Sequence, residues 1–270
     1  MIFLKILCIG DLHGHWPKKL NKTYIKKNKI DLILVNGDLG KDLTSHFYTV
    51  YKKGEKRPIR EVVGNKKWEK LIKKEAESSA KILMKFDKLG PEVLFVYGNG
   101  DSSKKAWYLK NSDDPKFEDY LGKLNNVAYL EYTSRKINGY TFFGVGNKFT
   151  RLIKQKVYEK IRKNHKKKLN DFFKKKPKNV ILLTHETPYM VFDKVLYRHS
   201  FRYGMRIGDD ILRKMILKYK PIASVFGHMH EYWGAKKLGK TLCINCGYGM
   251  KGKAVILNLE TKKIRRVRLN

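Results

Sequence analysis

The sequence has few cysteines, few acidic residues and no long apolar run. Three cysteines in 270 residues do not make a disulfide framework, so we expect a reducing compartment, the cytoplasm. No apolar stretch approaches the roughly 18 residues of a membrane-spanning helix, and no cleavage site follows the apolar N-terminal run. These absences exclude a disulfide-rich scaffold and predict that the chain has no membrane partner. The 42% of apolar residues is enough for a sizeable core.

The shortage of acids leaves a large positive charge. Lys and Arg number 60 against 25 Asp and Glu, which gives a formal net charge of +35. Such an excess attracts polyanions, so one reading of the charge is a nucleic-acid partner; the other is heat adaptation or a surface bias, which also produces Lys-rich chains. Residues 151–178 contain thirteen Lys or Arg against two acids. We expect a basic helix around 151–175, either a nucleic-acid face or a solvated one, without interleaved aromatic residues.

Short, continuous apolar runs organise the chain. They cover residues 2–9, 31–35, 93–97, 180–183 and 222–226. Runs of this length and kind are typical of strands buried on both faces. Helical periodicity lies between them, from Trp68 to Leu83, from Ile153 to Phe173 and after Asp209, which we expect to be an N-cap. Strands that alternate with helices predict a layered α/β fold with a mostly parallel core.

The rest of the chain shows no internal repeat and no linker, so we expect one domain over 1–270. The tail from 240 to 269 is typical of hairpin-like strands, with turns at 247–252 and 260–262. The stretch 41–90 is long for a simple crossover between two strands, which predicts a cap or a peripheral insertion there.

Each of the five runs ends in a residue that can bind a metal ion. Two of the runs add a second such residue two positions later, which gives seven candidate ligands: Asp11, His13, Asp38, Asn99, His185, His228 and His230. The carboxyl ends of strands in α/β sheets converge, so we expect these side chains to meet. Imidazole, carboxylate and amide donors suit Mn, Fe, Ni, Co or Zn better than Ca or Mg. Seven ligands exceed the needs of one ion, and two divalent ions that share Asp38 account for all of them.

The five segments also carry a family resemblance. Gly10-Asp11-Leu12-His13, Gly37-Asp38, Gly98-Asn99, Thr184-His185 and Gly227-His228-Met229-His230 resemble, in order, the motifs of the calcineurin-like metallophosphoesterase family. Residues 244–247 resemble the strand that commonly follows. A lone Gly-Asp is usually a turn and a lone His is usually structural, but five motifs in order are specific.

The resemblance implies a four-layer α/β/β/α sandwich with two central mixed sheets. It also implies two metal sites: one formed by Asp11, His13, Asp38 and His230, the other by Asp38, Asn99, His185 and His228. The implied reaction is hydrolysis of a phosphate ester by a hydroxide that bridges the two ions. Two ions about 3.5–4 Å apart suit an in-line displacement at phosphorus.

One motif departs from the family pattern. Many members have a His after the Asn, and that imidazole is taken to protonate the leaving group, whereas this chain has Gly100. Some small bacterial and archaeal phosphodiesterases of the family also lack this His and have Asp next, as Asp101 stands here. Asn99 therefore remains as the catalytic residue of the motif, and Asp101, His15 and His199 are alternative proton donors.

Three arginines precede Gly208 in the loop between the last two motifs: Arg198, Arg202 and Arg206. They either bind a substrate phosphate or are simply solvated. The leading hypothesis is a two-metal phosphoesterase that acts on phosphodiesters of nucleotides or nucleic acid. The alternatives are a phosphomonoesterase and a non-catalytic, metal-stabilised nucleic-acid-binding protein. The sequence leaves the oligomeric state open.

Overall fold

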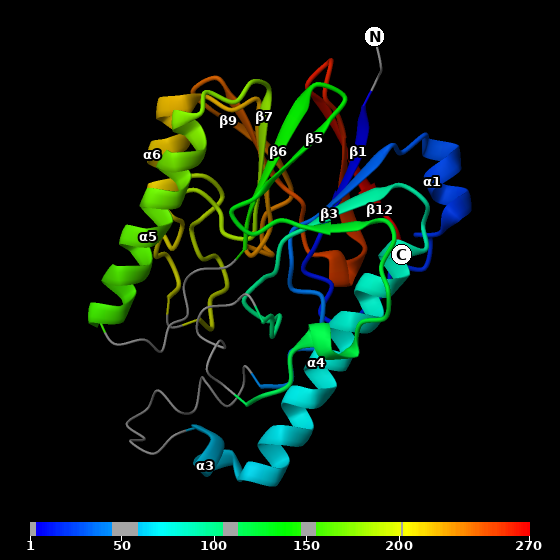
Figure 1. Cartoon of the computed structure of the whole chain (residues 1–270), viewed down its shortest axis with the longest axis vertical. Coiled ribbons are helices and arrows are strands. Elements are labelled where there is room, and N and C mark those ends of the chain that lie inside the picture. Colours follow the sequence, from blue (N-terminus) through cyan, green and yellow to red (C-terminus); the bar gives the residue numbers. More distant parts are fainter. Residues whose placement is uncertain (1–3, 45–58, 105–112, 147–154, 201) are drawn as a thin grey trace.

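Two six-stranded sheets form the centre of the computed structural model, which describes residues 4–44, 59–104, 113–146, 155–200 and 202–270 (Figure 1). The first sheet contains, in spatial order, β12 (Lys263–Arg268), β11 (Lys253–Asn258), β1 (Lys5–Ile9), β2 (Leu32–Val35), β3 (Glu92–Phe95) and β4 (Val127–Tyr129). The second contains β5 (Ser134–Ile137), β6 (Tyr140–Val145), β7 (Val180–Thr184), β8 (Ala223–Phe226), β10 (Thr241–Asn245) and β9 (Gly234–Leu238).

Both sheets are mixed, with a parallel centre. Strands β1 to β4 are parallel to one another, and the antiparallel pair β11 and β12 extends the first sheet beyond β1. Strands β6, β7, β8 and β10 are parallel, while β5 and β9 are antiparallel edges of the second sheet. Because the parallel strands of each sheet run the same way, their carboxyl ends lie at one edge.

The strands are buried on both faces, which makes four layers. In β1, Ile6 and Cys8 pack into the core between the sheets, whereas Leu7 and Ile9 join the core beneath the helices of the first sheet. Those helices are α1 (Lys22–Asn28) and α4 (Asn65–Asp87). A third core lies between the second sheet and its helices, α5 (Gln155–Lys174) and α6 (Asp210–Tyr219). Three cores between four layers confirm the predicted sandwich.

The hydrophobic patterns in the sequence correctly predicted most of the central strands and helices. All five apolar runs are strands, and the Asp209 side chain caps α6 by accepting hydrogen bonds from the N–H groups of Ile211 and Leu212. The tail prediction was wrong at its first turn. Strand β10 pairs with β8 in the second sheet, and the chain crosses at η3 (Gly249–Lys251) to β11 in the first sheet. Only β11 and β12 form the expected hairpin.

The stretch 41–90 contains two helices, α3 (Ile59–Val63) and α4, while residues 45–58 lie outside the described part. The apolar stripe of α4, which includes Ala76, Leu83 and Phe86, covers the first sheet, and its N-terminal half extends past the sheet with α3 (Figure 1). A short 3-10 helix, η2 (Phe117–Tyr120), leads towards β4.

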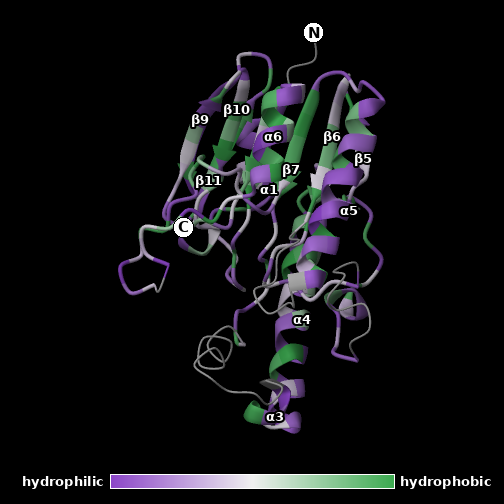
Figure 2. Ribbon diagram, turned by 90° about the vertical axis from the view of Figure 1, so that its left-hand side faces the viewer, coloured by the Kyte–Doolittle hydropathy of each residue, from purple (hydrophilic) through white to green (hydrophobic). Residues whose placement is uncertain are grey.

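Helix α5 is the expected basic helix, although residues 151–154 are not described. In Figure 2 it is mostly hydrophilic, in contrast to the hydrophobic strands behind it. His165 and Leu169 are buried towards the second sheet, whereas Lys166, Lys167 and Lys168 are exposed. The outward face of α5 is therefore basic. No helix within the described ranges is both long and apolar enough to cross a membrane.

Candidate metal centre

The predicted ligands meet where the strands end. Asp11 and His13 follow β1, Asp38 follows β2, and Asn99 follows β3 in the first sheet. His185 follows β7, and His228 and His230 follow β8 in the second. The centre therefore lies where loops from both sheets converge. Four of these residues, Asp11, His13, Asp38 and His228, have φ between 44° and 65°, a left-handed conformation that tight turns impose at functional sites.

Glycines of the motifs leave room for the carboxylates. A Cβ atom on Gly98 would lie 2.0 Å from Oδ1 of Asp38, and one on Gly227 would lie 2.2 Å from Oδ2 of Asp11. Neither distance is sterically possible, and in both cases the neighbour is a buried side chain. The two glycines therefore have a direct structural role beside the predicted ligands.

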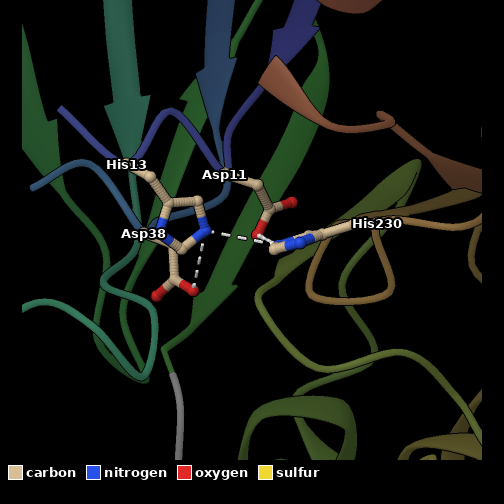
Figure 3. Close-up of side chains that lie close together, drawn as sticks. All are labelled: Asp11, His13, Asp38 and His230. Carbon is tan, nitrogen blue, oxygen red and sulfur yellow. Dashed lines mark hydrogen bonds and ion pairs between the residues drawn. The ribbon is translucent and has the colours of Figure 1, made fainter. Parts of the chain in front are cut away.

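Four of the predicted ligands form one compact group. A nitrogen or oxygen atom from each of Asp11, His13, Asp38 and His230 lies within 4.8 Å of the others (Figure 3). Nε2 of His13 lies 3.3 Å from Nε2 of His230 and 3.8 Å from Oδ2 of Asp38, and Nε2 of His230 lies 3.4 Å from Oδ1 of Asp11. Figure 3 shows the four side chains pointing towards one another.

The other three ligands form a second group that also adjoins Asp38. Nε2 of His185 lies 3.0 Å from Oδ1 of Asn99, 3.2 Å from Nδ1 of His228 and 3.6 Å from Oδ2 of Asp38. The same Asp38 oxygen therefore faces His13 of the first group and His185 of the second. Its other oxygen, Oδ1, accepts a hydrogen bond of 2.7 Å from the Gly100 N–H.

A hydrogen bond beneath His185 fixes which of its nitrogens is available. Nδ1 of this ring lies 2.8 Å from the backbone oxygen of Asn36, which can only accept, so Nδ1 carries the hydrogen. In neutral His185, Nε2 therefore presents a lone pair to Asn99, His228 and Asp38. Lone pairs that face one another at this distance repel unless a proton or a metal cation lies among them. Ligands about 2.1 Å from an ion lie roughly 3–3.5 Å apart, close to the separations here.

The electrostatics of the site also favour a cation. Burial lowers the pKa of His185, but the carboxylates of Asp38, Asp11 and Glu186 raise it to about 9. Burial likewise opposes protonation of His230, yet its hydrogen bond to Asp11 raises its pKa. The pKa of Asp11 is lowered by His230 and the neighbouring imidazoles although burial raises it. The centre thus stabilises positive charge, and its donor set fits divalent metal ions.

Two groups at the centre were missed by the sequence reasoning. Oε2 of Glu186 lies 3.7 Å from Nε2 of His228, on the side of that ring away from His185. The Tyr248 ring stacks on His230 at 4.1 Å between centroids and meets His13 edge-on at 5.8 Å. Glu186 directly follows His185, which is a local signal. Tyr248 follows the resembling strand 244–247, but nothing in the sequence indicates its contact with His230.

Asp101 lies beneath the centre instead of facing it. It is 1% exposed, and its Oδ2 accepts hydrogen bonds from the N–H groups of Asp38 (2.7 Å) and Gly98 (2.9 Å). Its Oδ1 accepts from Leu39 N–H at 2.9 Å and from the Ser79 hydroxyl of α4 at 3.1 Å. Burial, followed by repulsion from Asp38, raises its pKa. With both oxygens accepting hydrogen bonds, Asp101 positions the turn that carries Asp38 and points away from solvent; its role as a proton donor stays a prediction.

Helix α4 supports the neighbouring loop in a similar way. Oε1 of Glu75, a buried residue of α4, accepts hydrogen bonds from the N–H groups of Leu43 (2.6 Å) and Thr44 (2.7 Å). The Thr44 hydroxyl donates to Oε2 at 3.2 Å. Burial raises the pKa of Glu75 to about 7, despite these hydrogen bonds. The chain after Asp38 is thus tied to α4 through a carboxyl group that titrates near neutrality.

The two other predicted proton donors are exposed and lie outside the metal-ligand groups. Nδ1 of His15 contacts the backbone oxygen of His13 at 3.1 Å, so this ring is close to the first group. His199 meets the ring of Tyr197 edge-on at 5.6 Å in the loop after β7. Position 100 has no side chain, and among the described residues other than its chain neighbours the Asp38 carboxylate is the group within 4 Å of where its Cβ would be.

The arginines between the last two motifs do not have the same surroundings. The Arg206 guanidinium donates a hydrogen bond of 2.6 Å to Oδ1 of the fully buried Asp193, which fixes it within the loop. Arg198 is exposed and Arg202 is partly exposed. The charge of Arg206 is therefore paired with a carboxylate of its own loop, and substrate binding by these arginines stays a prediction.

Comparisons with known proteins agree with this geometry. The family model for calcineurin-like phosphoesterases matches residues 4–232. The chain belongs to the calcineurin-like phosphoesterase family, a family of phosphoester hydrolases. The UPF0046 protein K07C11.7 of Caenorhabditis elegans is 31% identical over 139 residues, which are 51% of this chain and 43% of the worm protein. The matched region thus spans less than half of that relative's length.

Solved structures share the fold at low identity. The protein TT1561 of Thermus thermophilus aligns over 100% of both chains with a TM-score of 0.55 and 14% identity. A dimetal phosphatase from Danio rerio aligns over 99% of each chain with a TM-score of 0.53 and 9% identity. A further crystal structure aligns over the whole of both chains with a TM-score of 0.70 and 18% identity. These similarities support the sandwich fold alone.

Proposed function

We propose that this chain is a two-metal phosphodiesterase, with Asp38 as the ligand that both ions share. The observation that carries the proposal is the position of Asp38 Oδ2, which is 3.8 Å from the His13 nitrogen of one group and 3.6 Å from the His185 nitrogen of the other. Asp11, His13 and His230 complete the first site, and Asn99, His185 and His228 complete the second. Mn, Fe, Ni, Co and Zn suit these donors.

The residues of the chain then have separable tasks. When bound, the two ions supply Lewis acidity and make water a nucleophile at neutral pH. The Gly100 N–H and the Asp101 carboxylate orient Asp38 from below, and the Asn36 carbonyl holds His185 in the tautomer that a ligand needs. Glu186 lies beside the second nitrogen of His228, as carboxylates do behind metal-binding imidazoles.

The absence of a side chain at position 100 supports a diester substrate. A phosphodiester carries one negative charge, so its displacement requires activation of phosphorus more than a pocket for a dianion. Gly100 has no side chain that could give a proton to the leaving group. The buried Asp101 carboxyl does not take over that role. We therefore expect turnover of esters whose leaving group departs as an anion. The charge of +35 suits a nucleotide or nucleic-acid ester.

Hydrolysis of bis-p-nitrophenyl phosphate, compared with p-nitrophenyl phosphate, tests the proposal. We expect activity with at least one of Mn, Fe, Ni, Co or Zn, a higher kcat/KM for the diester, and none in Asp38→Ala. A higher kcat/KM for the monoester would contradict the diesterase assignment and favour a phosphomonoesterase. No hydrolysis of either compound with any of these metals would contradict an enzyme and favour the non-catalytic nucleic-acid-binding alternative.

A further inference from the structure

The loop between β7 and α6 exposes an unusual amount of apolar surface. Among the described residues, eight large apolar side chains are at least 36% exposed, and six of them fall between 189 and 205. The six are Tyr189, Met190, Leu196, Tyr197, Tyr203 and Met205. An exposed apolar cluster of this kind marks an interaction surface. We refer to the described residues 189–200 and 202–208 as the aromatic hairpin.

The aromatic hairpin is held in a defined shape. The Val195 N–H donates to the Met205 oxygen and the Gly204 N–H donates to the Val195 oxygen, both at 2.9 Å. At its base, the ion pair between Arg206 and buried Asp193 joins the two sides. The tips of the Tyr197 and Tyr203 side chains are nonetheless open, since these residues are 62% and 54% exposed. The two described sides of the hairpin are thus joined by backbone hydrogen bonds and an ion pair, while both rings are exposed.

The aromatic hairpin is connected to two of the segments that carry predicted metal ligands. It begins four residues after His185, and its N-terminal side is hydrogen-bonded to the residues that directly follow His230. The Leu196 N–H donates to Glu231 Oε1 at 3.1 Å, and the Tyr232 hydroxyl donates to the Lys194 oxygen at 2.8 Å. The rings of Phe192 and Tyr232 also contact each other, with centroids 5.3 Å apart. The hairpin is therefore joined directly to residues that are neighbours in sequence of the predicted metal ligand His230.

The charge of the aromatic hairpin indicates what it binds. It carries four cations, Lys194, Arg198, Arg202 and Arg206, against the single acid Asp193, which is buried and paired with Arg206. Exposed tyrosines interleaved with arginines are the combination that binds single-stranded nucleic acid, because rings stack on bases while cations track the phosphates. Helix α5, by contrast, presents lysines on its exposed face without interleaved exposed rings.

We propose that the aromatic hairpin binds single-stranded nucleic acid, with Tyr197 and Tyr203 stacking on bases and Arg198 and Arg202 contacting phosphates. The proposal rests on the proposed function in one respect, since a strand held here would present its phosphodiester to the neighbouring centre. The proposal therefore assigns single-stranded nucleic acid, and not a small phosphate ester, as the substrate class.

Fluorescence anisotropy with a labelled twelve-residue oligo(dT), in the presence of a chelator so that no cleavage occurs, tests the binding. Replacing both Tyr197 and Tyr203 by Leu should weaken binding by at least about fivefold for each ring removed. Replacing both by Phe should preserve the affinity, because the rings remain. Leu217→Ala, which removes an apolar side chain exposed on α6, is the matched control and should bind like the natural protein.

A second arm separates stacking from charge. An abasic oligonucleotide of equal length keeps the phosphates and should bind the natural protein as weakly as oligo(dT) binds the double Leu variant. Equal binding of the abasic and normal strands, or full affinity in the double Leu variant, would overturn the proposal. Displacement of oligo(dT) by poly-glutamate, added at an equal concentration of negative charges, would also overturn the proposal, because it would indicate an acidic protein partner.

The outcome is separable from that of the proposed function. Hydrolysis of bis-p-nitrophenyl phosphate without any binding of oligo(dT) would overturn the proposal for the aromatic hairpin but still support the proposed diesterase activity. Ring-dependent binding of oligo(dT) without hydrolysis in any metal would overturn the diesterase and support the hairpin as a nucleic-acid site.

Discussion

Placing an imidazole at position 100 tests whether the missing side chain limits the chemistry. In Gly100→His, the new Cβ would lie 3.4 Å from Oδ1 of Asp38, an ordinary van der Waals contact, and the backbone φ is not in the left-handed region. The Gly100 N–H that holds Asp38 belongs to the backbone and is retained. The substitution should therefore leave the centre intact and add a proton donor beside it.

The expected gain depends on the leaving group. General acid catalysis is worth about 10²–10⁴-fold, and an imidazole that evolution has not positioned should reach at most the lower end, about 10²-fold. The gain should be largest for diesters with alkyl leaving groups and small for p-nitrophenyl esters, whose anions leave unaided. Because the imidazole must be protonated to donate, activity on alkyl esters should fall as pH rises through its pKa.

The assay is kcat/KM for a series of diesters of increasing leaving-group pKa, with Gly100→Asn as a control of similar bulk and no acid. The natural protein should show a steep loss of rate with leaving-group pKa, and Gly100→His a shallower one. A flat dependence in the natural protein would reveal a different acid, such as His15 or His199. An equal effect of Gly100→His and Gly100→Asn on every ester would refute proton donation.

Three further predictions concern other parts of the molecule. Asn99→Ala removes one neutral ligand of the second site, so metal analysis should find the first ion retained, and loss of both ions would contradict separate sites. The pKa of Glu75 is raised from 4.5 to about 7 in the folded state, so the natural protein loses folding stability as pH rises between these values. In chemical denaturation, the free energy of unfolding of Glu75→Gln relative to that of the natural protein should therefore rise by up to about 3 kcal/mol between pH 4 and 8. A difference that does not change with pH would refute this. Replacing Lys166, Lys167 and Lys168 by Gln should flatten the log–log salt dependence of duplex DNA binding by up to about 0.9 for each phosphate that the variant no longer neutralises, whereas an unchanged slope would leave α5 a solvated surface.

The sequence predicted the parts of the fold that rest on continuous apolar runs. Strands such as β1 and β7 are buried on both faces, and their composition alone shows it. Strands β5 and β9 were not foreseen, because they are edges whose side chains are largely exposed and whose pairing depends on distant partners. The same reason explains the wrong pairing of the tail, since periodicity does not determine which sheet β10 joins.

The candidate centre was predictable in its members but not in its supports. Asp38 and His185 each end an apolar run, and the convergence of strand ends brings them together. The role of Asp101 was not predictable, because it depends on amides from two loops and a hydroxyl from α4 that meet only in the folded chain. The pairing of Arg206 with Asp193 likewise depends on the shape of the aromatic hairpin.

The shared carboxylate is tested most directly by counting metal ions. After incubation with Mn²⁺ and removal of the excess, elemental analysis of the natural protein should find two ions per chain. Asp38→Ala should lose metal from both sites, because Oδ2 of Asp38 faces His13 and His185 alike. Circular dichroism of the same sample establishes that the variant is folded. Two full equivalents of metal in folded Asp38→Ala would contradict the shared-ligand assignment.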